Sequence, residues 1–360
     1  MAPDSAGTEL VTAVAAILAA AALALFWNRS QGWRRVVLRG ASVLACVVTS
    51  VAFAGSWVNH EVDFWPSWTS EHDTVPDAKS AAPATGPISA GPVTSTVRGS
   101  GRVVSVTVAG PASKLAMPMW VYLPVGYDPA GSLRYPVIEA LHGYPGVSAQ
   151  WLHALNAPKI LDREIAAGRM APTVVLFPQQ SPRPLRLDTE CTNLVGSAQT
   201  ETFLTQDVPE YARSHFKVRS DHSGWSLIGF SAGAYCATQL LLRHPNQYAA
   251  AASLSGYLDP GIHVGDGSEH TTYNILWRLQ HLPVPAVALY LSAARADTGA
   301  FAATVAIAKA AHNPLALTTS YINGGGHSTQ SWRAMEAPAF DWLSTWLGQP
   351  TTEVGFASPL

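Results

Sequence analysis

The chain has 360 residues, of which 48% are hydrophobic and 13% are charged, so it can bury a large core and still have apolar segments left over. Its 22 basic and 24 acidic residues nearly cancel. This balance argues against nucleic acid as a partner, because capturing phosphates requires a strong positive field, and it favours a neutral or apolar partner.

Two uncharged apolar stretches occupy the first domain, residues 1–60. They run from Leu10 to Trp27 and from Gly40 to Val58, and each is close to the roughly 20 residues that cross a bilayer core. The short loop between them carries a cluster of arginines: Arg29, Arg34, Arg35 and Arg39. The positive-inside rule therefore predicts a transmembrane hairpin with a cytoplasmic loop, and an extracytoplasmic location for everything after Val58.

A cleaved export signal is the alternative interpretation of this region. Ala52-Phe53-Ala54 is similar to a processing site, and Val43-Leu44-Ala45-Cys46 faintly resembles a lipidation box. The apolar stretch of such a signal should precede its cysteine, whereas Arg39 lies only seven residues before Cys46. Both interpretations place the rest of the chain outside the cytoplasm.

Composition divides the remainder of the chain. From Thr69 to about Gly101 the chain is rich in Pro, Ala, Ser, Gly and Thr, with too few large apolar residues to offset ordering, and residues 61–101 are expected to form a flexible linker. Residues 102–350 are expected to form the folded domain, and residues 351–360 a tail.

Short β-branched runs alternate with helical patterns in the folded domain. Eight strands are predicted, near Val103, Met119, Tyr135, Pro172, Ser226, Ala249, Ala286 and Leu315. Helices are predicted at Ala149–Ala167, Phe203–His215, Ala232–Arg243, Thr271–Gln280, Ala300–Ala311 and Gln330–Leu347. The first two strands have no helix between them, so the pattern indicates an α/β fold with an antiparallel start and a mostly parallel, two-sided sheet.

The sequence Gly229-Phe230-Ser231-Ala232-Gly233 follows a predicted strand and enters a predicted helix. In that context G-x-S-x-G indicates a nucleophile elbow, in which the two glycines permit a sharp reversal and Ser231 is presented as the nucleophile. The bare pentapeptide also arises by chance, and the alternative is a small residue packed at a buried turn. The context favours the elbow.

A serine hydroxyl needs an imidazole to accept its proton, and the imidazole needs an acid to fix its tautomer. In this class of fold the chain order is Ser, acid, His. Only His327, in "INGGGHST", follows the last predicted strand, so it is the candidate base. His281 and His312 are interpreted as solvated or capping residues, and His142 as structural.

Asp297 is the favoured acid, because it ends the penultimate predicted strand 30 residues before His327. Its rivals are Asp259, Asp266 and Glu269, and Asp259 precedes a proline in a typical turn sequence. The oxyanion that forms during attack needs preorganised N–H donors. We expect these from the backbones of Ala232 and Tyr144, with Gly143 in "LHGYPG" allowing close approach to the substrate.

Three cysteines are present, and Cys46 falls in a predicted membrane segment. A disulfide between Cys191 and Cys236 is predicted in an exported domain, with two independent thiols as the alternative. "HVGDGSEH", from His263 to His270, matches no standard metal-ligand spacing, and neither a phosphate-binding loop nor a dinucleotide fingerprint occurs. No metal and no cofactor are therefore expected.

Several phrases occur in the order found in a known family: "LHGYPG", "ETFLTQDVPEYA", "GFSAGA", "HPNQYAAAASLSGYLDPG" and "GGGHSTQSW". They resemble the extracytoplasmic antigen 85 mycolyltransferases and the esterase D-type serine esterases. The resemblance implies an α/β-hydrolase fold and acyl transfer to water or a sugar hydroxyl, with Ser231 and His327 as nucleophile and base. Antigen 85 proteins differ in carrying the acid as a glutamate on the helix before the histidine, in having neighbouring cysteines within one loop, and in being secreted free.

These observations predict a membrane-anchored extracytoplasmic serine esterase or acyltransferase. Its substrate would be an ester or acyl lipid, with a cell-envelope glycan as a candidate acceptor besides water. Two alternatives stay open: a serine peptidase with the same triad, and a non-catalytic protein that binds a lipid or a wall polymer.

Overall fold

The computed structural model describes residues 6–27, 31–62, 99–182 and 187–352. The chain divides into two compact units, residues 1–74 and 75–360. The predicted linker at 61–101 and the predicted tail at 351–360 lie almost entirely outside the described residues.

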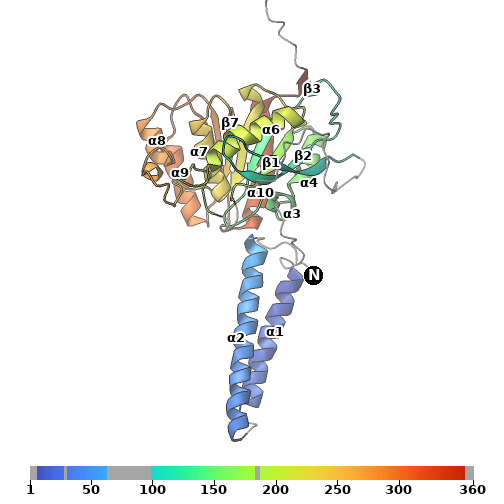
Figure 1. The fold of residues 1–360 in the computed structure, drawn as a ribbon, viewed down its shortest axis with the longest axis vertical. Helices are drawn as coiled ribbons and strands as arrows, with labels where there is room; N and C mark the ends of the chain where they lie inside the picture. Colours follow the sequence, from blue (N-terminus) through green and yellow to red (C-terminus); the bar gives the residue numbers. More distant parts are fainter. Residues whose placement is uncertain (1–5, 28–30, 63–98, 183–186, 353–360) are drawn as a thin grey trace, which may run out of the picture. The chain divides into compact units, whose positions relative to one another are not determined.

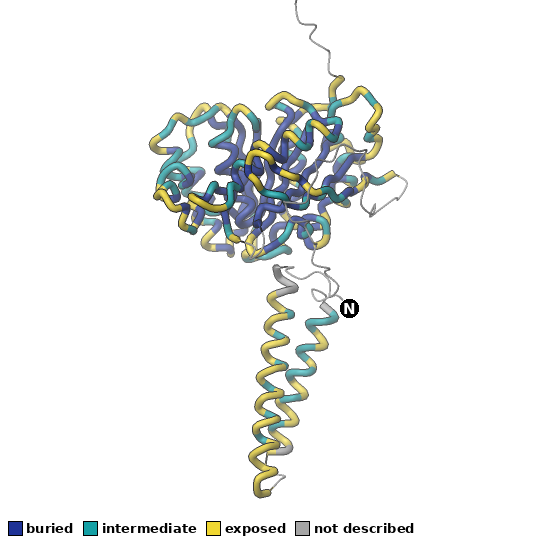
Figure 2. The backbone as a smooth tube through the Cα atoms, in the orientation of Figure 1, coloured by how far each residue is buried: buried dark blue, intermediate teal, exposed yellow. Residues whose placement is uncertain are grey.

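The first unit contains helices α1 (Ala6–Phe26) and α2 (Trp33–Val62), which pack against each other. The hydroxyls of Thr12 and Ser56 hydrogen-bond across the pair at 2.7 Å. Both helices are long and apolar enough to cross a membrane. Figure 2 shows α2 as largely exposed and α1 as a mixture of exposed and intermediate residues.

Helix α2 begins seven residues before the predicted start at Gly40. Arg34, Arg35 and Arg39 therefore lie within its first two turns, not in a loop as predicted from the sequence. Arginine is a good helix former, so the charge that ends the apolar stretch does not end the helix.

The second unit is built on an eight-stranded sheet (Figure 1). Its strands in chain order are β1 (Arg102–Ala109), β2 (Ala116–Leu123), β4 (Val137–Leu141), β5 (Val174–Pro178), β6 (Trp225–Phe230), β7 (Ala250–Leu254), β8 (Ala288–Ala294) and β9 (Ala316–Ile322). The order across the sheet is β1-β2-β5-β4-β6-β7-β8-β9. Strand β2 is antiparallel to both of its neighbours, and every pair from β5 to β9 is parallel. The predicted α/β architecture and its eight strands are confirmed.

Helices cover both faces of this sheet. One apolar core joins it to α6 (Val208–His215), α7 (Ala232–Arg243), α8 (Ile275–His281) and α9 (Thr298–Ala310). The other joins it to α3 (Gln150–His153), α4 (Ala157–Ala166) and α10 (Thr329–Leu347). The remaining described elements are short: the strand pair β3 (Leu133–Arg134) and β10 (Thr351–Thr352), α5 (Thr200–Thr202), the π-helix η1 (Phe203–Asp207), and the 3₁₀ turns η2 (His222–Gly224) and η3 (Ser268–His270).

Two predicted helices differ in detail. The one expected at 149–167 is divided into α3 and α4, because Asn156 adopts a left-handed backbone with φ of 59°. The one expected at 203–215 opens with the π-helix η1, directly before a helix whose second residue is Pro209. Proline has no N–H to donate to the preceding turn, and a widened turn accommodates the missing bond.

Parallel strands bring their following loops to a common edge. Ser231 follows β6, Asp297 follows β8, and His327 follows β9. The loop that begins at His142 follows β4, the strand next to β6. The topology therefore gathers the predicted site residues at the carboxyl edge of the sheet.

The predicted disulfide is present: Cys191 and Cys236 are bonded, with their Cα atoms 5.6 Å apart. Cys191 lies in the long connection after β5, and Cys236 lies in α7, five residues after Ser231. The bond therefore fastens that connection to the helix that follows Ser231.

Removing this bond should destabilise the fold. The cysteines are 45 residues apart, and for a loop of that length the chain-entropy model gives a loss of about 4 kcal/mol in the free energy of unfolding. Cys191→Ser combined with Cys236→Ser should show this loss in urea titrations followed by tryptophan fluorescence. Cys46→Ser, which removes the free thiol of α2, is the control, and an equal effect there would contradict the expectation.

Candidate active site

Ser231 stands at the junction of β6 and α7 with φ of 54° and ψ of −120°. This conformation is sparsely populated for a residue with a side chain. It is held by the close approach of the flanking backbone: a Cβ on Gly229 would lie 2.0 Å from the Gly233 carbonyl oxygen, and one on Gly233 would lie 2.1 Å from the Leu141 carbonyl oxygen. The G-x-S-x-G motif therefore forms the sharp strand-to-helix turn of a nucleophile elbow.

His327 meets Ser231 directly, with its Nε2 2.7 Å from the serine Oγ. The imidazole lies in the loop between β9 and α10, and its side chain is 42% exposed, whereas Ser231 is 8% exposed. Trp332 in α10 places its ring edge-on to the imidazole, with centroids 5.1 Å apart. Ser328 caps α10 by accepting from the Ser331 N–H, which fixes the residue next to the histidine.

Asp297 lies on the other side of the imidazole, with its Oδ2 2.6 Å from His327 Nδ1. Its other oxygen accepts the Ala300 N–H at the start of α9, at 3.4 Å. With Nδ1 facing a carboxylate, the imidazole carries its proton on Nδ1 and leaves Nε2 to accept from the serine hydroxyl. This is the arrangement that makes a serine nucleophilic.

The rival acids are engaged elsewhere. Asp259 and Asp266 accept the N–H groups of Gly261 and Ser268 in turns. Glu269 lies 2.7 Å from His263 Nδ1. The geometry therefore favours Asp297 as the partner of His327.

The loop after β4 reaches Ser231. A Cβ on Gly143 would lie 3.3 Å from the Ser231 Cβ and 2.8 Å from the Phe230 ring, so only glycine lets the loop approach this closely. Ala232 is the first residue of α7, and a first-turn N–H has no acceptor within its own helix. The Ala232 N–H therefore directly follows Ser231, and Tyr144 directly follows Gly143, which contacts Ser231.

His142 is fully buried and fixes this loop. Its Nε2 accepts the Gln180 N–H at 3.2 Å, so its Nδ1 carries the proton and donates to the Gly143 carbonyl at 2.7 Å. The Gln180 side chain also donates to the His142 carbonyl, at 2.7 Å. In a trans peptide the N–H points opposite to the C=O, so the Tyr144 N–H is directed away from His142.

The disulfide-linked connection carries two acidic residues, Asp188 and Glu190. Tyr257, from the loop after β7, donates to the Glu190 carboxylate at 2.5 Å. Burial and the nearby Asp188 raise the pKa of Glu190 to about 9, so this acid is neutral at pH 7. Glu190 and Cys191 both have positive φ, 44° and 53°, a strained stretch that the disulfide and the tyrosine hold in place.

Glu201, in the phrase "ETFLTQDVPEYA", has a structural role. Burial by itself would raise its pKa, but hydrogen bonds from His244 and Arg243 outweigh burial and hold it at about 2. Tyr273 donates a third bond, at 2.5 Å. This ionised cluster ties α5 to the end of α7 and to the segment before α8.

The structure thus brings Ser231, His327 and Asp297 together. His281 and His312 instead hydrogen-bond to nearby backbone carbonyls. Within the described residues, no group of three or more His, Cys, Asp or Glu could hold a metal ion. Sequence reasoning missed Trp332 and Gln180. An aromatic five residues after the histidine is a weak signal for Trp332, and none marked Gln180, whose role depends on the register between β4 and β5.

A comparison with protein families finds a match over residues 111–343 to the family described as "Putative esterase". The curated relatives include an uncharacterised protein of Corynebacterium glutamicum, 26% identical over 68% of this chain and 62% of that protein. Diacylglycerol acyltransferase/mycolyltransferase Ag85B of Mycobacterium intracellulare is 42% identical over 18% of this chain and 19% of its own length. The chain thus spans less than two thirds of each of these relatives.

Solved structures share the fold. A ferulic acid esterase aligns with a TM-score of 0.59 at 17% identity, over 69% of this chain and 99% of that one. An S-formylglutathione hydrolase from Agrobacterium tumefaciens aligns with a TM-score of 0.57 at 16% identity, over 71% and 99%. These likenesses confirm the predicted α/β-hydrolase architecture of the second unit.

The elbow should not tolerate a methyl group at Gly229. Gly229→Ala should lower the free energy of unfolding by at least about 3 kcal/mol, because the clash is with backbone and cannot be relieved by a rotamer change. Thermal unfolding followed by circular dichroism measures the loss. Gly299→Ala in α9 is the matched control, since no atom lies within 4 Å of its added Cβ; equal behaviour of the two variants would refute the packing argument.

Proposed function

The chain belongs to the family described as "Putative esterase", and from that premise we propose that it is a serine esterase or acyltransferase with Ser231, His327 and Asp297 as its catalytic triad. The observation that carries the proposal is the unbroken line of hydrogen bonds from the serine Oγ through the imidazole to the aspartate. The names of the relatives support the same chemistry, because each named activity is attack on an acyl group.

In the first half of the reaction the Ser231 Oγ attacks the ester carbonyl carbon while its proton passes to His327 Nε2. Asp297 accepts the Nδ1–H and stabilises the imidazolium that forms. The carbonyl oxygen becomes an oxyanion, which the N–H groups of Ala232 and Tyr144 stabilise. Collapse of this intermediate breaks the bond to the alcohol, which leaves with the proton from Nε2.

In the second half a water or another hydroxyl attacks the acyl-serine. His327 accepts the proton of the attacking hydroxyl and then returns it to the Ser231 Oγ as the acyl group leaves. The cycle restores the enzyme and consumes one ester and one hydroxyl acceptor. Water gives hydrolysis, and an alcohol gives acyl transfer.

The triad predicts a graded loss of activity. Ser231→Ala should lower kcat for a short p-nitrophenyl ester by on the order of 10⁶-fold, since the nucleophile is removed, and Asp297→Asn by on the order of 10⁴-fold, since the imidazole loses its tautomer. Ser231→Ala should also abolish labelling by a fluorophosphonate. Asp259→Asn is the control; if it costs as much activity as Asp297→Asn, the acid is wrongly assigned.

We propose that this enzyme is anchored in a membrane, with its catalytic unit on the outer face. Helices α1 and α2 support an anchor by their length and apolar surface. Arg34, Arg35 and Arg39 lie next to the turn between them, and Arg39 also packs over the Trp27 ring, 4.2 Å from its centroid. By the positive-inside rule the turn would be cytoplasmic and the catalytic unit would lie on the opposite side.

Labelling with a membrane-impermeant maleimide tests this topology in spheroplasts that express the protein. In a Cys46→Ala background, Ala130→Cys on the exposed loop after β2 should label in intact spheroplasts. Gln31→Cys, at the turn between α1 and α2, should label only after lysis. Labelling of Gln31→Cys before lysis would reverse the orientation, and release of an unanchored domain would indicate a cleaved signal.

A further inference from the structure

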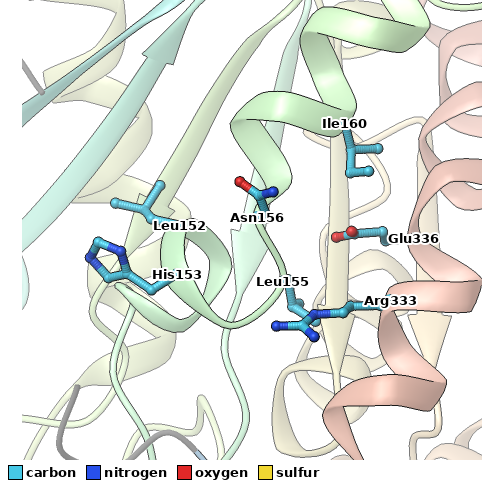
Figure 3. Close-up of a pocket in the computed structure, with 7 residues that line it drawn as sticks. All are labelled: Leu152, His153, Leu155, Asn156, Ile160, Arg333 and Glu336. Atoms are coloured by element: carbon cyan, nitrogen blue, oxygen red, sulfur yellow. The ribbon is translucent and has the colours of Figure 1, made fainter. Parts of the chain in front are cut away.

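A pocket lies between α4 and α10, and none of Ser231, His327 and Asp297 lines it. It has a volume of approximately 650 Å³, within the range of small-molecule sites. Its lining comes from α3, α4 and α10 and the residues between them: Leu152, His153, Leu155, Asn156, Ile160, Arg333 and Glu336. Figure 3 shows the Glu336 carboxyl group and the Arg333 guanidinium extending from α10 toward the α3–α4 segment.

Glu336 is the unusual member of this pocket. It is 1% exposed, and neither carboxyl oxygen has a hydrogen-bond partner among the described residues. Burial raises its pKa to about 9, although the charges of Arg333 and Arg163 act in the opposite direction. At pH 7 the group is therefore a neutral carboxylic acid, with one O–H to donate and free oxygen lone pairs to accept.

The neighbouring polar groups offer both kinds of hydrogen bond. Asn156 lies at the break between α3 and α4, and its side chain makes no capping bond. Arg333 is exposed, and its Nε donates to the Ala154 carbonyl. Leu152, Leu155 and Ile160 supply apolar surface beside these groups.

A ligand that satisfies Glu336 must accept a hydrogen bond from its O–H and donate one to its other oxygen, and ligand classes differ in whether they do both. An ammonium group would cause Glu336 to lose its proton and would pair with the carboxylate, but the Arg333 guanidinium in the same pocket would repel it. A carboxylate would accept from both residues but leave the second Glu336 oxygen unpaired. A pair of adjacent hydroxyls offers a donor and an acceptor together, and satisfies both oxygens without a net charge.

We infer that this pocket is a binding site for a neutral ligand with adjacent hydroxyl groups, the chemistry of a sugar ring. Because the two Glu336 oxygens have almost no exposed surface, the wall must open to admit the ligand. Arg333 is the exposed member of that wall, and we expect its side chain to rotate away from the Ala154 carbonyl when the ligand binds.

The pocket adjoins the groups that position the catalytic residues. Phe230, the residue before Ser231, packs between Trp151 and Trp332, with centroids 5.2 Å and 4.7 Å away. Trp151 belongs to α3, which forms one wall of the pocket. Trp332 directly precedes Arg333 in α10, which forms another wall. A sugar held there lies against the same two helices that support the nucleophile and the base.

Ligand-observed saturation-transfer NMR on the full chain in lipid nanodiscs tests the site at pH 7. D-glucose should bind saturably, and glucosamine, glucuronate and cyclohexanol should bind at least about tenfold more weakly, because each leaves a buried polar group unpaired or adds a charge. A linear glucose hexamer is titrated alongside. Tighter binding of the hexamer identifies a polymer as the natural occupant, and equal binding identifies a free sugar.

Substitutions at Glu336 test whether glucose binds at this pocket and not elsewhere on the protein. Glu336→Leu should weaken glucose binding at least about tenfold without destabilising the protein, since it removes an unpaired buried group. Glu336→Gln, which keeps a donor and an acceptor, should retain binding. Glu139→Gln is the control, because Glu139 is a buried acid on β4 that bonds to Tyr248.

Two results would overturn the inference. One is the absence of saturable glucose binding, or binding indifferent to Glu336→Leu, which would mean that ordered water alone satisfies the carboxyl group. The other is loss of binding in Ser231→Ala, which would place the sugar in the catalytic site. Hydrolysis of the p-nitrophenyl ester, measured on the same samples, reports on the triad independently.

Discussion

The backbone contact between Gly229 and Gly233 is the constraint on which the geometry of the proposed active site depends. The Ser231 backbone adopts a conformation that few side-chain-bearing residues tolerate, and it is stable only because strand and helix close around it without intervening side chains. The same closure sets α7 against the end of β4. It thereby brings Gly143 to Ser231, so one local strain organises both the serine and the proposed oxyanion donors.

The global architecture could be predicted from the sequence because its signals are local and repeated. Each strand is a short apolar or β-branched run, and each is followed by glycine, proline or a helical pattern. Parallel pairing then carries Ser231, Asp297 and His327 to one edge without any knowledge of their contacts. The disulfide could also be anticipated, since only two cysteines lie outside the predicted membrane segments.

Other features depend on contacts that no local pattern encodes. Asp259 and Asp297 both follow sheet strands near the same edge, and only the loop geometry shows that Asp297 faces the imidazole while Asp259 completes a turn. The network of His142 and Gln180 arises from the register of β4 and β5. The apolar stretch predicts a start for α2 at Gly40, whereas the helix begins at Trp33, because charge limits membrane burial and not helix formation.

The first turns of helix α10 both support the His327 imidazole and line the pocket against α3 and α4. Its cap at Ser328 fixes the chain beside His327, and Trp332 supports the imidazole and Phe230 together. Arg333 and Glu336, one turn apart, line the pocket against α3 and α4. A buried acid without a partner costs stability at that position, while an apolar residue of similar size would pack there at no such cost. Core packing therefore does not explain why α10 carries this buried acid next to the turn that contacts His327. A ligand that satisfies the acid would offset its cost in stability.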